Sequence, residues 1–254
     1  EVHSFTDEVF HGNPAGVCPL EKWLDDELMQ KIAAENGISE TAFFVPAEGH
    51  YELRWFTPTT EVDLCGHATL ATAFVLFDEL GYQGEAIRFE TKSGTLHVAR
   101  LGSSLVMDFP SRPGEECDAP DHLSAGLGRP AKEVYKSRDY LVVYPDEEVV
   151  RSLDPDFSEL AKVDALGIIV TAPGNDVDFV SRFFAPRAGV DEDPVTGSAH
   201  CTLAPYWADR LEKKDLSARQ VSRRGGELAC RLADDRVHIA GHAALYFKGV
   251  LSVE

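Results

Sequence analysis

The residue with the clearest potential for proton transfer is Glu40, which lies in Ser39-Glu40-Thr41 directly before the apolar run TAFFV. A carboxyl group at the edge of an apolar strand is partly shielded from water. This disfavours its charged form and suits acid–base work near neutral pH. The alternative is an ordinary strand-edge acid that faces water. The sequence therefore makes Glu40 a candidate general acid–base catalyst.

Two glycine–polar steps, Gly66-His67 and Gly197-Ser198, each precede an apolar stretch that we expect to form a buried helix. The unpaired N–H groups of a helix N-terminus bind anions, and glycine lets a ligand approach the backbone closely. We expect both steps to face one cleft and to bind a small carboxylate, with His67 as the partner of Asp193 across that cleft. Each step alone also fits an ordinary helix start.

An acidic run, Asp191-Glu192-Asp193, lies just before the second step. Carboxylates near a helix N-terminus are stabilised by the helix dipole, which gives a purely structural explanation. The functional interpretation is that Asp193 faces the cleft, where it handles a proton or orients an amine or hydroxyl of the substrate.

A thiol beside the first step leaves a second mechanism open. Cys65 precedes the glycine, and a thiolate at a helix N-terminus can act as a base. A two-thiol racemase needs a second thiol opposite, but the corresponding stretch 193–196 has none, and Cys201 lies inside the expected helix. The two-thiol form of this mechanism is therefore not supported.

Motifs for metals and nucleotides are absent from the sequence. The His residues show no HExxH or paired spacing, and no CxxC occurs. No GxGxxG or GxxxxGK[ST] loop is present either. We therefore expect a site without metal or cofactor.

The candidate residues belong to two copies of one pattern. RWFTP from Arg54 and RFFAP from Arg182 share residue classes, and both lead through acidic residues to a glycine–polar step. SGTLHVARL resembles GGELACRL, and ETAFFVPAEG resembles ALGIIVTAPG, in the same order and at a nearly constant offset. A repeat of domain size predicts two similar domains.

Each copy is expected to contain an apolar strand (41–45 or 167–171), a strand that ends at a proline, and a buried helix (68–80 or 199–211). An amphipathic helix is expected over 21–36. The predicted fold is α+β, with two similar domains related by pseudo-two-fold symmetry. Each domain is a mixed, mostly antiparallel sheet curled around a central helix. The domains cover residues 1–112 and 113–254, and the last strand (243–250) can pair with either domain.

The composition of the chain argues against several classes of binding partner. Hydrophobic residues make up 44% and charged residues 26% of the 254 residues, as in folded globular proteins. A net charge of −19 repels nucleic acids and anionic lipids. No apolar run approaches a membrane span, and the start shows no secretory pattern. The five scattered Cys favour reduced thiols, so we expect a cytoplasmic protein without nucleic-acid or membrane partners.

Taken together, FTDEVFHGNPAGV, ISETAFF, RWFTPTTEVDLCGHATLA and GVDEDPVTGSAH resemble the PhzF-like phenazine-biosynthesis family, within the diaminopimelate-epimerase-like fold. The resemblance runs from about Phe5 to the end of the chain. It implies two similar α+β domains with the active site between them. It also implies cofactor-independent isomerisation by proton transfer, usually in a homodimer. The founding reaction of the family moves a double bond in dihydro-hydroxyanthranilate, an acidic cyclic diene.

The resemblance also assigns roles to residues of this sequence. The family's acid–base Glu, cleft Gly and His, cleft Asp and carboxylate-binding Gly-Ser fall, in that order, on Glu40, Gly66, His67, Asp193, Gly197 and Ser198. Epimerase relatives carry a catalytic thiol at the position of Cys65. The opposing position in this chain is Asp193, which disfavours amino-acid racemisation.

The function that we expect is a cofactor-independent isomerase that moves a proton and a double bond in a small carboxylic acid. Two alternatives stay open: a cysteine-dependent amino-acid epimerase, and a non-catalytic protein that binds small carboxylates. The substrate is not specified by any of these motifs.

Overall fold

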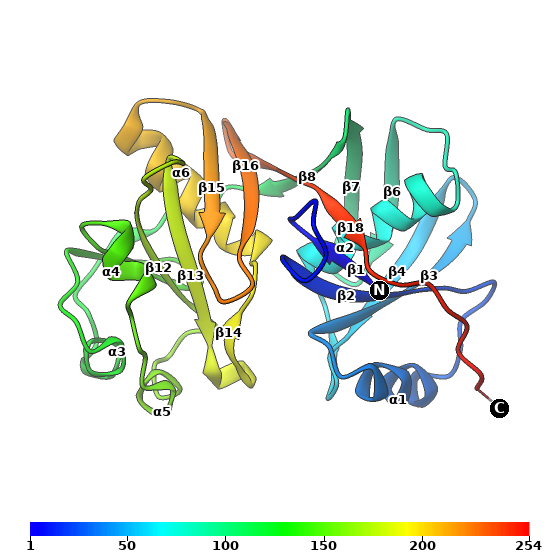
Figure 1. The fold of residues 1–254 in the computed structure, drawn as a ribbon, viewed down its shortest axis with the longest axis horizontal. Helices are drawn as coiled ribbons and strands as arrows, with labels where there is room; N and C mark the ends of the chain where they lie inside the picture. Colours follow the sequence, from blue (N-terminus) through cyan, green and yellow to red (C-terminus); the bar gives the residue numbers. More distant parts are fainter. Residues whose placement is uncertain (254) are drawn as a thin grey trace. The chain divides into compact units, whose positions relative to one another are not determined.

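The chain forms two compact units in the computed structural model, which describes residues 1–253 (Figure 1). Unit 1 comprises Glu1–Asp108 together with the segment from Ala240 onward, and unit 2 comprises Phe109–Ile239. The sequence places the boundary after residue 112. In the structure the chain leaves unit 1 within strand β8 and returns to it within strand β17.

Unit 1 contains a mixed sheet whose strands pair in the order β18–β1–β2–β3–β4–β6–β7–β8. The pairs β2–β3 and β4–β6 are parallel, and the other pairs are antiparallel. A short strand, β5, lies antiparallel to the end of β4. The bounds are β1 Val2–Ser4, β2 Asn13–Pro19, β3 Glu40–Ala47, β4 His50–Phe56, β5 Glu61–Val62, β6 Ala86–Thr91, β7 Gly94–Leu101, β8 Ser104–Pro110 and β18 Ala243–Leu245.

Two helices pack on this sheet. Helix α1 (Asp26–Asn36) buries Met29, Ile32 and Ala33 against aromatic side chains of β3 and β4. Helix α2 (Gly66–Phe74) contacts β1, β2 and β3, and Figure 1 shows it among these strands. Every residue of α2 from His67 to Ala73 is buried, as its apolar sequence predicts. The helix therefore forms the centre of unit 1.

Unit 2 repeats this topology. Its strands pair in the order β9–β10–β11–β12–β13–β15–β16, with β11–β12 and β13–β15 parallel and a short β14 beside β13. The bounds are β9 Glu115–Glu116, β10 Glu133–Lys136, β11 Tyr140–Val143, β12 Ile168–Pro173, β13 Phe179–Ala185, β14 Val190–Asp193, β15 Asp215–Gln220, β16 Gly226–Ala233 and β17 Arg236–Gly241.

The longest helix of unit 2 packs on β15 and β16. Helix α6 (His200–Leu211) is largely buried, and its Trp207 stacks on Phe179 and donates a 3.0 Å hydrogen bond to Thr171. A second apolar cluster joins β11–β13 to three short helices, α3 (Asp121–Leu127), α4 (Glu147–Arg151) and α5 (Phe157–Leu160). The predicted α+β fold of two similar units, each with a buried helix against its sheet, is confirmed.

Helix α6 tolerates a proline in its interior. Pro205 has no N–H to donate to the carbonyl of Cys201, one turn earlier. The backbone N–H of Arg112 donates to that carbonyl instead, at 2.8 Å. The segment that enters unit 2 thus satisfies the carbonyl that the proline leaves without a partner.

Several expected helix bounds were wrong. Residues 21–25 lie outside α1, which begins after Asp25 in extended backbone. The first buried helix begins at Gly66 rather than Ala68, and from Val75 to Glu79 it continues as a π-helix (η1). In unit 2, Gly197–Ala199 form a 3-10 turn (η3) before α6. No helix among residues 1–253 is long and apolar enough to cross a membrane.

The repeated arginines form the same clamp in both units. Arg54 holds Glu61 through its Nε and Nη2 atoms, at 2.7 and 2.9 Å. Arg182 holds Glu192 in the same two-pronged way, at 2.7 and 3.0 Å. Each pair fastens a short strand, β5 or β14, to the strand that carries the arginine. The RWFTP and RFFAP repeats therefore encode this clamp.

We expect Glu192→Gln to lower the free energy of unfolding by about 1–3 kcal/mol, because it weakens charge-assisted hydrogen bonds that are largely shielded from water. Urea unfolding of the full chain measures this change. The control is Glu227→Gln, which removes a 69% exposed partner of Arg219 and should change stability by less than about 0.5 kcal/mol. Equal changes in the free energy of unfolding for the two variants would show that the clamp stabilises the fold no more than an exposed ion pair does.

Candidate active site

A carboxylate and an imidazole meet where β3 and α2 begin. Glu40 is the first residue of β3 and His67 is the second residue of α2. Glu40 Oε2 lies 3.1 Å from His67 Nε2, and their side chains are 19% and 7% exposed. Oε2 accepts no well-aligned hydrogen bond from the described residues, so the contact is a close ion pair. This pair brings together two of the predicted catalytic residues.

The other nitrogen of His67 contacts Asn13 and Cys65. Its Nδ1 lies 3.2 Å from Asn13 Nδ2 and 3.5 Å from Cys65 Sγ. A neutral imidazole accepts from the amide nitrogen through Nδ1, whereas an imidazolium donates from both nitrogens and requires the amide oxygen of Asn13 to face it. The proton on His67 is therefore coupled to the orientation of the Asn13 amide.

The start of α2 is held by β1 and positioned by the strand register. The hydroxyl of Ser4, on β1, donates to the backbone carbonyl of His67 at 2.7 Å. Asn13, the first residue of β2, lies two positions before Ala15, which pairs with Glu40 in the parallel β2–β3 ladder. The sheet register thus delivers Asn13 and Glu40 to the same helix start.

Charge within this cluster favours a protonated imidazole. Burial acts to lower the pKa of His67, but its close contacts with Cys65 and Glu40 raise that pKa well above its usual value. Burial also raises the pKa of the Cys65 thiol, and the charge of Glu40 adds to this effect. The thiol therefore keeps its proton near neutral pH, and Glu40 is the anion that holds His67 charged.

The same three residues could also serve as metal ligands. One ligand atom from each of Glu40, Cys65 and His67 lies within 4.8 Å of the others. Carboxylate, thiolate and imidazole are all ligands that zinc accepts. The expectation of a reaction without metal or cofactor stays a prediction.

In unit 2 a buried glutamine fixes the loop that follows Asp193, the last residue of β14. Gln220 Nε2 donates to the carbonyl of Asp193 at 2.7 Å, and Gln220 Oε1 accepts from the backbone N–H of Thr196 at 2.8 Å. The Thr196 hydroxyl donates to the Asp193 carboxylate. With the Arg182–Glu192 clamp just before it, Asp193 is held from both sides.

The predicted carboxylate-binding residues, Gly197 and Ser198, lie in the 3-10 turn after this loop. Gly197 is buried, and the half-buried Ser198 accepts a 3.3 Å hydrogen bond at Oγ from Arg138 Nη2. His200 Nδ1 lies 2.9 Å from the carbonyl of Thr196, and burial lowers the pKa of this histidine to about 4. A neutral His200 therefore donates to Thr196 and stabilises the turn.

The structure groups the predicted residues into two sets. Glu40, Gly66 and His67 lie together in unit 1, while Asp193, Gly197 and Ser198 lie together in unit 2. Three residues that no sequence pattern singled out contact them: Asn13, Arg138 and Gln220. Asn13 lies in FTDEVFHGNPAGV, one of the motifs that carry the family resemblance, whereas Gln220 lies in no distinctive motif.

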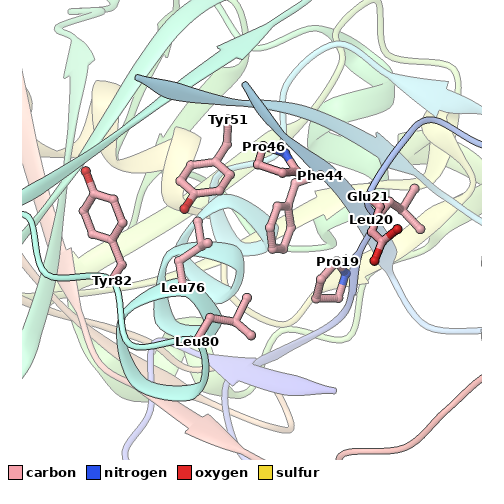
Figure 2. A pocket seen from close by; sticks show the side chains of 9 residues that line it. All are labelled: Pro19, Leu20, Glu21, Phe44, Pro46, Tyr51, Leu76, Leu80 and Tyr82. Carbon is pink, nitrogen blue, oxygen red and sulfur yellow. The ribbon is translucent and has the colours of Figure 1, made fainter. Parts of the chain in front are cut away.

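A separate pocket in unit 1 has a volume of about 310 Å³ (Figure 2). Phe44 and Pro46 from β3, Leu76 from η1 and the ring of Tyr51 surround it. Its other lining residues are Pro19, Leu20, Glu21, Leu80 and Tyr82. Neither Glu40 nor His67 lines this apolar pocket, so it does not belong to the ion-pair site.

We expect nitrogen NMR of the imidazole rings at neutral pH to show His67 protonated on both nitrogens and His200 neutral. Because the folded pKa of His67 is raised, its protonation stabilises the fold below the unfolded pKa, and this contribution is lost as pH rises through the folded pKa. In Glu40→Gln the pKa of His67 should fall, whereas His200 should titrate as before. An unchanged His67 titration in this variant would contradict the role given to Glu40.

Comparisons with known proteins cover nearly the whole chain. The PhzC-PhzF family model, described as phenazine biosynthesis-like protein, matches residues 2–249. An uncharacterized isomerase of Pseudomonas aeruginosa is 55% identical over 99% of this chain and 97% of its own length. The crystal structure of a PhzF family phenazine biosynthesis protein from Enterococcus faecalis has a TM-score of 0.97 at 49% identity, covering 99% of this chain and 97% of the other.

A more distant structure extends the likeness in fold. A probable proline racemase from Agrobacterium radiobacter has a TM-score of 0.65 over 100% of this chain and 92% of its own. Its sequence is only 10% identical, so this likeness shows a shared fold alone.

Proposed function

Because this chain belongs to the PhzC-PhzF family of phenazine biosynthesis-like proteins, we propose that it is an isomerase that moves a proton, and with it a double bond, within a small carboxylic acid. The relative from Pseudomonas aeruginosa is also named an isomerase. The observation that carries the proposal is the ion pair of Glu40 and His67, where a partly exposed carboxylate lies 3.1 Å from a buried imidazole.

In the proposed reaction the Glu40 carboxylate takes a proton from a carbon next to the unsaturated system. The electron pair left behind shifts the double bond, and the same carboxyl group returns the proton to another carbon on the same face. No electrons are gained or lost, so the step needs no redox partner. General acid–base catalysis of this kind contributes about 100- to 10,000-fold to the rate.

His67 has a supporting role in this scheme. Its imidazolium orients the Glu40 carboxylate before the reaction. When Glu40 takes the proton, the positive charge on His67 has lost its partner and can stabilise the negative charge that develops on the substrate. Gly66 permits close approach of the substrate to the backbone beside this imidazole.

The residues of unit 2 have proposed roles in substrate binding. We assign Asp193 to orient an amine or hydroxyl of the substrate, and Gly197 and Ser198 to bind its carboxylate. Support comes from the way Asp193 is held, by Thr196, Gln220 and the neighbouring arginine clamp. A homodimer and a cytoplasmic location remain predictions of the sequence.

A cysteine-dependent epimerase is the second candidate, because Cys65 Sγ lies 3.5 Å from His67 Nδ1. Against it, the thiol is 6% exposed and burial raises its pKa, which disfavours the thiolate that such a base requires. We therefore favour Glu40 as the proton carrier.

The proposed roles of Glu40 and Asp193 can be tested by isotope exchange. Deuterium exchange into a panel of cyclic and amino carboxylic acids, measured by mass spectrometry in heavy water, should identify a substrate. Glu40→Gln should then lower the exchange rate by about 100- to 10,000-fold, because the amide cannot carry the proton. Asp193→Asn should also reduce turnover.

Matched controls exist for both variants. Glu48→Gln changes an exposed acid just beyond the other end of β3, and Asp191→Asn changes an exposed acid two residues from Asp193. Both should keep the wild-type rate. Full activity in Glu40→Gln would refute the mechanism, and tight binding without exchange for every compound would favour a non-catalytic binding protein.

Substitution of Cys65 distinguishes the two enzyme mechanisms. Cys65→Ser should keep the exchange rate within about threefold of wild type, since removing a protonated thiol takes away no proton carrier. Far-ultraviolet circular dichroism checks that the variant is folded. A loss of several hundredfold, together with exchange at an amino-acid Cα in the wild type, would instead support the cysteine-dependent epimerase.

A further inference from the structure

An anionic substrate meets an unfavourable field at this protein. The net charge is −19, and the residues assigned to its carboxylate, Gly197 and Ser198, carry no positive charge. Neutral donors compensate a carboxylate less well than a charged, two-pronged donor such as arginine. A cation close to Ser198 would therefore supply what this part of the site lacks.

Arg138 is such a cation. Its Nη2 donates to Ser198 Oγ at 3.3 Å, and its Nε and Nη2 donate to Asp139 Oδ2 at 3.3 and 3.0 Å. The Asp139 side chain is 3% exposed, whereas that of Arg138 is 35% exposed. The guanidinium is thus anchored by a buried carboxylate on one edge. Its Nη1 makes no hydrogen bond to the described residues.

Asp139, which orients the Arg138 guanidinium, is itself held in a tight turn. Arg138 and Asp139 lie in the turn between β10 and β11, which is closed by a 3.0 Å hydrogen bond from the N–H of Ser137 to the carbonyl of Asp139. The second oxygen of Asp139 is buried without a hydrogen-bond partner among residues 1–253. Arg138 is therefore the cation that compensates this buried charge, and the pair fixes where the guanidinium points.

The duplication provides an independent reason to assign a function to this position. In unit 1 the start of β2 places Asn13 against His67, the polar residue of the Gly66-His67 step. In unit 2 the turn before β11, the counterpart of β2, places Arg138 against Ser198 of the Gly197-Ser198 step. Equivalent places in the two units therefore contact the two glycine–polar steps. Unit 1 has the amide of Asn13 there, beside His67, and unit 2 has the guanidinium of Arg138, beside Ser198.

We propose that Arg138 binds the substrate carboxylate together with Ser198, and that it makes the site selective for carboxylates over the corresponding neutral amides. The proposal rests on the function proposed above, in which Ser198 faces the substrate. Arg138 then supplies the charge of the subsite, Ser198 its hydroxyl, and Asp139 the orientation of the guanidinium.

A binding experiment tests this without requiring turnover. The probes are benzoate and cyclohexenecarboxylate, each compared with its neutral carboxamide, and the readout is the amide NMR signal of Ser198 in the full chain. In the wild type we expect the acids to shift this signal and to bind more tightly than the amides. In Arg138→Gln the dissociation constant of the acids should rise about 10- to 100-fold, with the amides unaffected.

Three further variants serve as controls for the effect of Arg138→Gln. Arg151→Gln removes another arginine paired with a buried carboxylate, Glu147, in helix α4, and should bind both acids like the wild type. If Arg138→Gln unfolds because Asp139 is left unpaired, Arg138→Gln combined with Asp139→Asn removes both charges and should show the same loss. Arg138→Lys keeps the charge without the planar fork and should recover only part of the affinity.

The proposal is overturned if Arg138→Gln, or the double variant, binds the acids as the wild type does. It is also overturned if wild-type protein binds acid and amide equally, or if neither acid shifts the Ser198 signal. Failure of the isomerase mechanism gives a different result. Arg138-dependent binding of the acids would then persist, but no compound would exchange deuterium, or exchange would continue in Glu40→Gln.

Discussion

The ion pair of Glu40 and His67 is the interaction on which the organisation of unit 1 depends. A charge held in a largely buried position is costly unless a partner of opposite charge lies beside it. Each of these side chains therefore reduces the cost of burying the other where β3 and α2 begin. The small apolar residues of α2 let the helix approach β1, β2 and β3 closely, and this approach brings the imidazole to the carboxylate. Core packing and the geometry of the proposed proton transfer thus have the same origin.

The two units show how duplication can separate scaffold from chemistry. Both carry a buried helix against a mixed sheet, and both fasten a short strand with an arginine–glutamate clamp. The polar residues near each helix start differ, because unit 1 has a carboxylate and an imidazole whereas unit 2 has an aspartate, a hydroxyl and a guanidinium.

The negative net charge of the chain limits how it can bind a carboxylate. Since the whole molecule repels anions, binding of a carboxylate must come from short-range donors with fixed directions. A guanidinium anchored on a buried carboxylate meets that requirement, because its orientation does not depend on the ligand. His67 is likewise influenced at short range, because the nearby Glu40 favours its charged form.

The sequence by itself determined the duplication, the α+β class, the buried helices and the candidate residues Glu40, His67 and Asp193. These features are written in local patterns of apolar residues, glycine and proline. Only the tertiary structure showed the 3-10 turn before α6, the satisfied carbonyl opposite Pro205, and the contacts of Asn13, Arg138 and Gln220 with the candidate residues. Those contacts join residues that are 27 to 60 positions apart. Strand register and helix packing bring such residues together, and no local pattern encodes which distant side chain completes a hydrogen bond.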